Sequence, residues 1–219
     1  MSEVPLTYRL EGIENVFEGA PPDHGCLISI DGFDGSGKST QVEALARHLS
    51  EEGQSVVKTR QPTDWYRNDP IVRRFHSDGG SPDEARDLAM MAAVDRHRHV
   101  ADVIRPALAK GATVICDRYV CSTFAVFTHR GVDLDFIVTI NRTVPRPNFA
   151  FYIDVPTNEL VNRLRGRDGA DLKFEERSLS RIESIVGKWK AMRGTVEFVD
   201  GLAPPDVVTR RMLDRISAR

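Results

Sequence analysis

Residues Ile30–Thr40 read IDGFDGSGKST, and Gly32 to Ser39 within this stretch match the pattern G-x-x-x-x-G-K-[ST]. This pattern is typical of a phosphate-binding loop (P-loop), because glycines let successive backbone N–H groups approach phosphate oxygens. Lys38 adds a positive charge at the β and γ phosphates, and the Ser39 hydroxyl is a ligand for Mg²⁺. An apolar segment precedes the loop and an amphipathic one follows it. The stretch therefore predicts a site for a nucleoside triphosphate rather than a simple glycine-rich turn.

Short apolar segments alternate with helical patterns along the rest of the chain. The expected strands are Cys26–Asp31, Val56–Arg60, Thr113–Asp117, Phe149–Asp154 and Val196–Asp200. The expected helices follow the P-loop up to Gly53, span Glu84–Lys110 with an interruption before Pro106, and carry Val208, Met212 and Ile216 near the end. This alternation predicts an α/β fold of the P-loop NTPase type, in three layers, with a parallel five-stranded sheet and helices on both faces. Ligands of such sheets bind beyond the carboxyl ends of the strands.

The composition narrows the class of protein. The 219 residues suffice for one sizeable core, and we expect an extension over residues 1–25 before a domain over 26–219. A net charge of −2 argues against a nucleic-acid polymer or an anionic membrane surface as partner. Three cysteines without metal or disulfide spacing, no signal sequence and no apolar run of about 20 residues predict a cytoplasmic protein.

Two further segments carry charge. In DRYVCS (Asp117 to Ser122), Asp117 ends an apolar strand and is placed to hold Mg²⁺ through water, while Arg118 would project into the same crevice and bind a second phosphate. The alternative is an Asp–Arg pair that only closes the strand. Residues 162–177 are rich in arginine and glycine, which favours a mobile lid that neutralises a migrating phosphoryl group and excludes water. The alternative there is a solvated basic helix end.

His97 and His99 invite a metal-site interpretation. Two residues apart on a helix, they point to different sides, and no cysteine or carboxylate stands at ligand spacing. We therefore expect both to be polar residues of the helix surface.

Together these segments resemble the thymidylate kinase (dTMP kinase) family. Members typically read EGxDGxGKTTQ, R-E-P, A-x-D-R and D-R-Y-x-x-S, followed by an arginine-rich lid; this chain has DGFDGSGKSTQ, RQP (60–62), AVDR (93–96), DRYVCS and the segment 162–177. The similarity runs from about Cys26 to the carboxyl terminus. It implies transfer of the γ-phosphoryl of ATP, with Mg²⁺, to the 5′-phosphate of dTMP or a close pyrimidine analogue. It also implies a small-molecule nucleotide acceptor and a homodimer, for which a helix face with Leu88, Met91 and Val94 is available. The alternative is that this face belongs to the core.

The resemblance also assigns roles to residues. The catalytic residues would be Lys38, Arg118, Arg165 and Arg167. ATP would be bound by Gly32, Asp34, Gly35, Ser36, Gly37, Lys38, Ser39 and Thr40. Ser39 and Asp117 would hold the metal. The acceptor would be bound by Asp34, Arg60, Pro62, Arg96, Arg118, Ser122 and Thr123. Within that set, Asp34 would contact the sugar, Arg96 the base and Arg118 the phosphate. Because Ser36 stands where some members carry a P-loop arginine, Arg165 or Arg167 of the lid would take over its role.

The chain departs from the family at three positions near the base. Ala92 replaces a phenylalanine that stacks on thymine, Val126 replaces an aromatic beside the sugar, and Gln61 replaces the glutamate of R-E-P. Loss of a stacking ring would cost about 1–3 kcal/mol of base affinity unless Trp65 or Phe124 fills the space. The alternatives are therefore a kinase of the same fold that acts on a modified nucleotide, a nucleoside or a specialised metabolite, or a non-catalytic nucleotide-binding protein.

Overall fold

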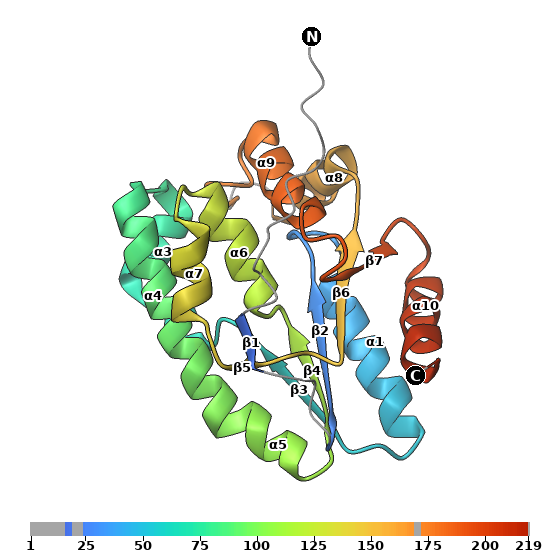
Figure 1. Ribbon diagram of the computed structural model, residues 1–219. Helices are drawn as coiled ribbons and strands as arrows, with labels where there is room; N and C mark the ends of the chain where they lie inside the picture. The colour runs from blue at the N-terminus through green and yellow to red at the C-terminus, as the bar shows by residue number, and fades with distance from the viewer. Residues whose placement is uncertain (1–15, 19–23, 169–171, 219) are drawn as a thin grey trace.

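The computed structural model describes residues 16–18, 24–168 and 172–218 and is built around one parallel sheet (Figure 1). Its strands lie in the order β3-β4-β2-β6-β7, and all neighbours are parallel. The strands are β2 (Cys26–Asp31), β3 (Val56–Arg60), β4 (Thr113–Asp117), β6 (Phe149–Asp154) and β7 (Glu197–Asp200). The predicted five-stranded parallel sheet is confirmed. The last strand begins at Glu197, one residue later than expected, because Val196 forms an isolated bridge with Arg193.

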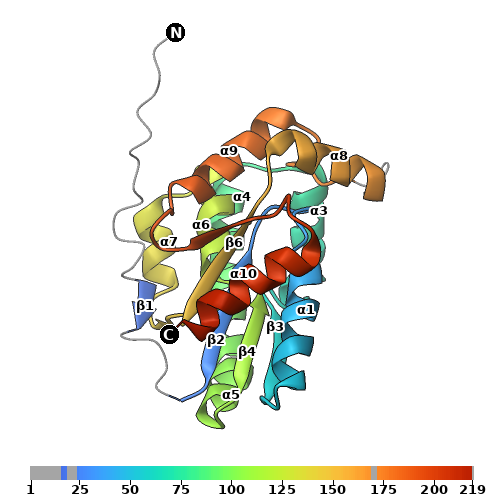
Figure 2. The same ribbon diagram turned by 90° about the vertical axis from the view of Figure 1, so that its right-hand side faces the viewer.

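Helices cover both faces of the sheet. One face packs against α1 (Lys38–Glu51) and α10 (Pro205–Ser217) (Figures 1 and 2). The other face is covered by α4 (Pro82–His99), α5 (Arg105–Ala109), α6 (Val120–His129) and α7 (Leu134–Ile140), and α2 (Asp64–Arg67) and α3 (Pro70–Asp78) follow β3. Over the carboxyl ends of the strands lie α8 (Thr157–Asp168) and α9 (Leu179–Lys190). Central strands are therefore apolar on both sides, as the full burial of Leu27, Ile28 and Ile30 shows. No described helix is long and apolar enough to cross a membrane.

The long helical stretch is interrupted where the sequence predicted. Ser81 and Glu84 form a capping box at the start of α4, which runs to His99. A π-helix, η2 (Val100–Ile104), then leads into α5, whose second residue is Pro106. Proline lacks an N–H, and its ring collides with the carbonyl four residues earlier in a regular α-helix. The wider π turn relieves this collision and keeps the two halves nearly continuous.

A second, two-stranded sheet was not predicted. In it β1 (Phe17–Glu18) pairs in parallel with β5 (Val144–Pro145), and Val16 and Val144 are fully buried. The carbonyl of Pro145 also accepts a hydrogen bond of 3.1 Å from the hydroxyl of Tyr119. The described part of the first 25 residues is thus docked on the same core that carries the segment Asp117–Ser122.

Candidate active site

The P-loop lies at the carboxyl end of β2, at the centre of the sheet. Gly37 has φ of 96° and precedes α1, whose first turn is capped by no described side chain. The backbone N–H groups of that turn are therefore available for an anion. Gly32 has φ of 155°, and a Cβ there would lie 2.6 Å from the Ser36 hydroxyl oxygen and 3.1 Å from the Ile153 carbonyl oxygen. Only glycine fits at this position, because the Ser36 hydroxyl lies where a side chain of residue 32 would be.

Lys38 and Ser39 begin α1 beside the end of β4. The buried Nζ of Lys38 donates to the Phe33 carbonyl at 2.9 Å and lies 3.5 Å from Oδ1 of Asp34. Burial, and then the charge of Arg118, lowers the pKa of Lys38 to about 8, although Asp34 acts to raise it. The Ser39 hydroxyl donates to Oδ2 of Asp117 at 3.1 Å. This contact follows from the sheet register, which pairs Ile30 of β2 with Asp117 of β4.

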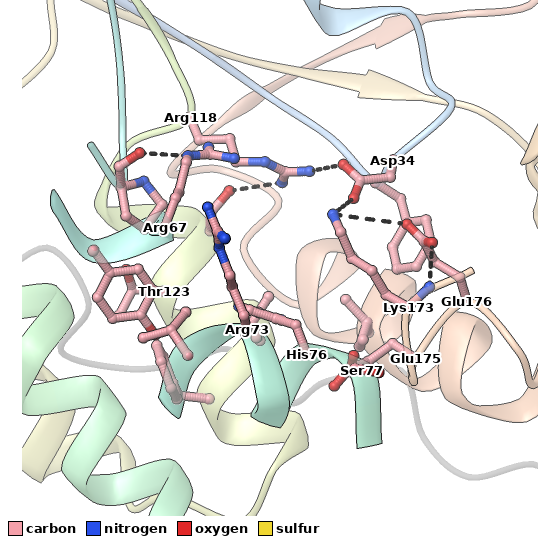
Figure 3. Close-up of a pocket in the computed structure, with 18 of the residues that line it drawn as sticks. Asp34, Arg67, Arg73, His76, Ser77, Arg118, Thr123, Lys173, Glu175 and Glu176 are labelled. Carbon is pink, nitrogen blue, oxygen red and sulfur yellow. Dashed lines mark hydrogen bonds and ion pairs between the residues drawn. The ribbon is translucent and has the colours of Figure 1, made fainter. Parts of the chain in front are cut away.

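A cavity of about 460 Å³ opens next to the P-loop (Figure 3). In the close-up, Arg67, Arg73 and Arg118 lie on one side, and Asp34, Lys173, Glu175 and Glu176 on the other. Its aromatic lining consists of Phe33, Tyr66, Tyr119, Phe127 and Trp189. The cavity therefore combines a charged end beside the P-loop with apolar rings.

Arg118 connects the P-loop to the cavity. One terminal nitrogen, NH1, donates to the Gly32 carbonyl at 2.8 Å and to the Ser122 hydroxyl at 3.2 Å, and the other donates to Oδ1 of Asp34. Its φ is 68°, in the left-handed region that non-glycine residues rarely adopt. The bond from its own N–H to the Ile30 carbonyl, 2.9 Å long, holds this conformation. Backbone strain of this kind is concentrated at functional sites, where surrounding contacts enforce it.

Asp34 is the common partner of three cations. Burial acts to raise the pKa of Asp34, but the charges of Arg118, Lys38 and Lys173 outweigh it and hold that pKa well below its ordinary value. Lys173 reaches Oδ2 of Asp34 at 2.6 Å from the segment between α8 and α9 (Figure 3). The same segment brings Glu176 into the cavity, where burial raises its pKa. The carboxylate of Asp34 in the P-loop thus contacts Lys38 of α1, Arg118 at the end of β4 and Lys173 of the lid segment.

Arg96 lines the cavity but is itself almost completely buried. Its Nε donates to Oε1 of Gln61 at 3.0 Å, NH2 donates to the Thr123 hydroxyl at 2.5 Å, and NH1 donates to the Asn141 side-chain oxygen. All three acceptors are neutral, and burial lowers the pKa of Arg96. The chain of contacts continues inward from Gln61 to His99, which is 8% exposed. The prediction that His99 lies on the helix surface is therefore wrong.

The comparisons with known proteins agree on one family. The family model described as Thymidylate kinase matches residues 30–199. The chain belongs to the thymidylate kinase family. A probable thymidylate kinase of Pyrococcus horikoshii is 38% identical over 146 residues, which cover 65% of this chain and 71% of that protein. Thymidylate kinases of Syntrophotalea carbinolica (37% over 164 residues, 70% and 76% covered) and Xanthomonas oryzae pv. oryzae strain PXO99A (34% over 188 residues, 85% and 81% covered) are also similar.

The structure gathers most, but not all, of the residues to which the thymidylate kinase resemblance gave a role. Those that line the cavity are Asp34, Pro62, Arg96, Arg118, Ser122 and Thr123. Arg60 does not line it; its exposed side chain pairs with Asp64 on the next helix. Arg165 is exposed on α8, and Arg167 belongs to the same helix, but its side chain lies outside the described residues. Thr40 is exposed in the first turn of α1.

The base side of the cavity differs from the expectation. Neither Trp65, which is 49% exposed, nor Phe124, which is fully buried, is among the lining residues, and Ala92 is likewise in the core. Of the rings that do line the cavity, Phe33 belongs to the P-loop and Tyr119 to DRYVCS, although neither was given a role. The other three, Tyr66, Phe127 and Trp189, lie outside the motifs.

Several charged residues of the cavity were missed, among them Lys173, Arg67 and Arg73, and these three had only a weak signal in the sequence. Lys173 stands in the predicted lid, but no motif marked it. Arg67 donates to the Pro62 carbonyl at 2.6 Å, and Arg73 donates to the Asn68 side-chain oxygen at 2.6 Å. Both follow the predicted RQP motif within a dozen residues, in a stretch without clear periodicity.

Proposed function

We propose that the P-loop holds ATP, that the adjacent cavity holds dTMP, and that the γ-phosphoryl of ATP passes to the phosphate of dTMP to give dTDP. As a thymidylate kinase the protein is a nucleoside monophosphate kinase, a phosphotransferase. The observation that carries the residue assignment is the meeting of Lys38 and Arg118 at one carboxylate, Asp34. Two anionic phosphates can therefore be held side by side, one by the P-loop and one by guanidinium.

The donor side of the site uses backbone and charge. The N–H groups of the P-loop and of the first turn of α1 would bind the phosphates of ATP, and the ammonium group of Lys38 would lie at the β and γ phosphates. The hydroxyl of Ser39 and the carboxylate of Asp117 are oxygen ligands of the type that Mg²⁺ prefers, and they already lie 3.1 Å apart. We propose that they hold the metal, which when bound neutralises charge on the phosphates.

The acceptor side uses Arg118 for the phosphate and the inner cavity for the nucleoside. The guanidinium of Arg118 can make two parallel bonds to a phosphate. Arg67 and Arg73 line the same end and add positive charge. We place the base toward Arg96 and Thr123, and the sugar toward Asp34. The volume of about 460 Å³ falls in the range of pockets that enclose small ligands.

The lid contributes cations from α8 and from the segment that follows it. Lys173 already contacts Asp34, and we propose that it, with Arg165 or Arg167, neutralises charge on the transferred phosphoryl group. Excluding water from the cleft is the second task of this segment.

dTMP is the acceptor that the comparisons support, and none of them supports a modified acceptor or a non-catalytic protein. An ADP-release assay with dTMP, dUMP, UMP, CMP and thymidine tests this. We expect the highest kcat/KM with dTMP, no turnover of thymidine, and loss of turnover by several orders of magnitude in Lys38→Ala. Equal rates with and without a monophosphate acceptor would refute the proposed function.

Three further proposals concern the whole protein. We propose that residues 26–219 form one domain and that the first 25 residues are an extension of it. We also propose a cytoplasmic location, with which the three cysteine thiols agree, and a homodimer. The expected dimer face needs correction, because Leu88 belongs to the core; the exposed apolar residues of α4 are Met90 and Val94, at 42% and 51% exposure. Sedimentation velocity on wild type and Val94→Asp tests the dimer; a wild-type monomer at all concentrations would exclude it.

A further inference from the structure

A row of hydrogen bonds leads from Arg96 at the cavity, through the buried Gln61 and His99, to the part-buried Thr59 of β3. Arg96 bonds to Gln61, Gln61 bonds to His99, and His99 bonds to Thr59. Gln61 is fully buried, and neither it nor His99 nor Thr59 lines the cavity, whereas Arg96 does. The row joins the end of β3 to the last turns of α4, and no role proposed above for the site uses Gln61, His99 or Thr59.

The chemistry of the donors fixes every proton in this row. Arginine has only N–H donors, so Gln61 must present its oxygen Oε1 to Arg96, 3.0 Å away. The amide nitrogen of Gln61 then faces Nδ1 of His99 at 2.9 Å, and because an amide nitrogen only donates, Nδ1 must accept. The proton of the neutral imidazole is therefore on Nε2, which donates to the Thr59 hydroxyl at 2.6 Å.

Protonation of His99 removes the acceptor on which the hydrogen bond from Gln61 depends. A proton on Nδ1 places an N–H against the NH₂ group of Gln61, donor facing donor. Turning the amide over would satisfy His99 but would place the NH₂ group against Nε of Arg96, again donor facing donor. Gln61 is buried, so water cannot compensate, and unpaired buried donors are costly. The charged form of His99 is therefore incompatible with the observed placement of Arg96.

The position of Arg96 depends on these acceptors to an unusual degree. Its three acceptors, Gln61, Thr123 and Asn141, are all neutral. A guanidinium group held by a carboxylate is kept in place by charge, whereas this one is kept in place by hydrogen-bond geometry. Two of its five N–H groups are not used in these three bonds, and the side chain lines the cavity.

We propose that Gln61 and His99 are positioning residues for acceptor binding: neutral His99 orients the Gln61 amide, the amide orients Arg96, and protonation of His99 weakens binding of the acceptor nucleotide. The proposal rests on the proposed function of the cavity as the dTMP site. Gln61, where the family motif has glutamate, makes the row dependent on the neutral histidine.

The surroundings of His99 set the pH at which this happens. Burial lowers the pKa of His99, Asp95 and Asp102 act to raise it, and Arg96 acts to lower it. The groups that face it from β3 and the following turn, Thr59 and Gln61, are neutral. Since the pKa lies below the ordinary 6.5, His99 is neutral at pH 7, and dTMP affinity falls only as the pH drops below about 6.5.

The tautomer can be tested without any activity measurement. Long-range ¹H–¹⁵N correlation spectra of the imidazole nitrogens should show His99 neutral at pH 8 with its proton on Nε2. In Gln61→Glu, a carboxylate can accept from both Arg96 and a protonated Nδ1, so the pKa of His99 should rise. A proton on Nδ1 at pH 8, or an unchanged pKa in Gln61→Glu, would overturn the proposal.

Kinetics test the link to the acceptor. His99→Asn keeps an oxygen acceptor near the position of Nδ1 but does not titrate, whereas His99→Leu keeps similar bulk without an acceptor. At pH 8 we expect the KM for dTMP to be near wild type in His99→Asn and raised roughly threefold to tenfold in His99→Leu, the size of one hydrogen bond. The KM for ATP should stay the same in both. Gln61→Met, which also removes the acceptor of Arg96, should raise the KM for dTMP in the same way.

The pH profile completes the test. The phosphate of dTMP itself titrates near pH 6, but it does so identically with every variant. As His99 titrates, the wild-type KM for dTMP should rise roughly threefold to tenfold more than that of His99→Asn. His97→Asn is the matched control and should follow wild type, since the hydrogen bond that the structure describes for His97 is to the Ile140 carbonyl and not to the row. Parallel profiles of wild type and His99→Asn, with normal dTMP turnover, would overturn this inference alone; absence of dTMP turnover would instead overturn the proposed function.

Discussion

Lys38 gives the sharpest pH prediction, because its ammonium group is buried beside another cation. Its pKa is lowered to about 8, first by burial and then by Arg118. The protonated form is the one that can bind phosphate, and it is lost as the pH rises through 8. The protonated fraction falls from about nine tenths at pH 7 to about one tenth at pH 9. If ATP binds only to the charged form, its apparent Kd should weaken about tenfold across this interval.

Isothermal titration of ATP at pH 7, 8 and 9 measures this directly. The phosphates of ATP are essentially fully ionised above pH 7, so they contribute little to the slope. Because the bound phosphates restore the charge on Lys38, binding at pH 8 should take up about half a proton per ATP, seen by comparing buffers of different ionisation enthalpy. Lys38→Ala is the control and should bind ATP weakly and without this pH dependence. A wild-type Kd that is flat from pH 7 to 9, with no proton uptake at pH 8, would show that the charge on Lys38 does not govern ATP binding.

Three further predictions test other parts of the site. Lys173→Met should lower kcat about tenfold, since it removes a charged bond to Asp34. It should barely change the melting midpoint, because the side chain of Lys173 is 49% exposed. Equal kcat in Lys173→Met and in the distant control Lys190→Met would contradict this. Gly37→Ala should destabilise the protein by about 1–2 kcal/mol through its φ of 96° alone, since a Cβ there meets no described atom within 4 Å. The control Gly166→Ala, at an exposed position in α8, should not destabilise the protein. Differential scanning calorimetry compares the two variants. Asp117→Asn should raise the Mg²⁺ concentration needed for half-maximal activity about tenfold and leave metal-free ATP binding unchanged; an unchanged Mg²⁺ requirement would remove Asp117 from the metal site.

The sheet could be predicted because its strands are runs of four to six residues, most of them mainly apolar, bounded by breaks and helical patterns. The paired strands β1 and β5 could not, because two residues carry no periodicity and their pairing joins positions far apart in the chain. The contact between Lys173 and Asp34 could not be predicted for the same reason, since 139 positions separate the two residues in the chain. Such contacts depend on the path of the chain rather than on any local pattern.

The buried residues of α4 lie at helical spacing along one side of the helix. Ala85, Leu88, Ala92 and Arg96 are buried along one stripe, and His99 continues it. Spacing of two residues showed that His97 and His99 point to different sides, but only the stripe indicates which of them points inward. The same stripe explains why Leu88 lies in the core, while Val94 lies on the opposite side.

The P-loop and the segment Asp117–Ser122 were predicted as separate motifs, and the parallel register of β2 and β4 explains their meeting. The motifs did not indicate which side chains contact each other in the site. They gave no sign that Asp34 is shared among three cations or that Arg96 bonds to three neutral groups. Side-chain partners of this kind follow from packing between elements that are distant in sequence.

Titrating ATP and dTMP separately into Lys38→Ala and Arg118→Met shows whether one cleft holds two phosphates with separate cations. We expect Lys38→Ala to lose at least tenfold in ATP affinity and to keep nearly all of its dTMP affinity. Arg118→Met should lose at least tenfold in dTMP affinity and keep nearly all of its ATP affinity. Equal losses for both nucleotides in both variants, or no loss in either, would contradict this expectation.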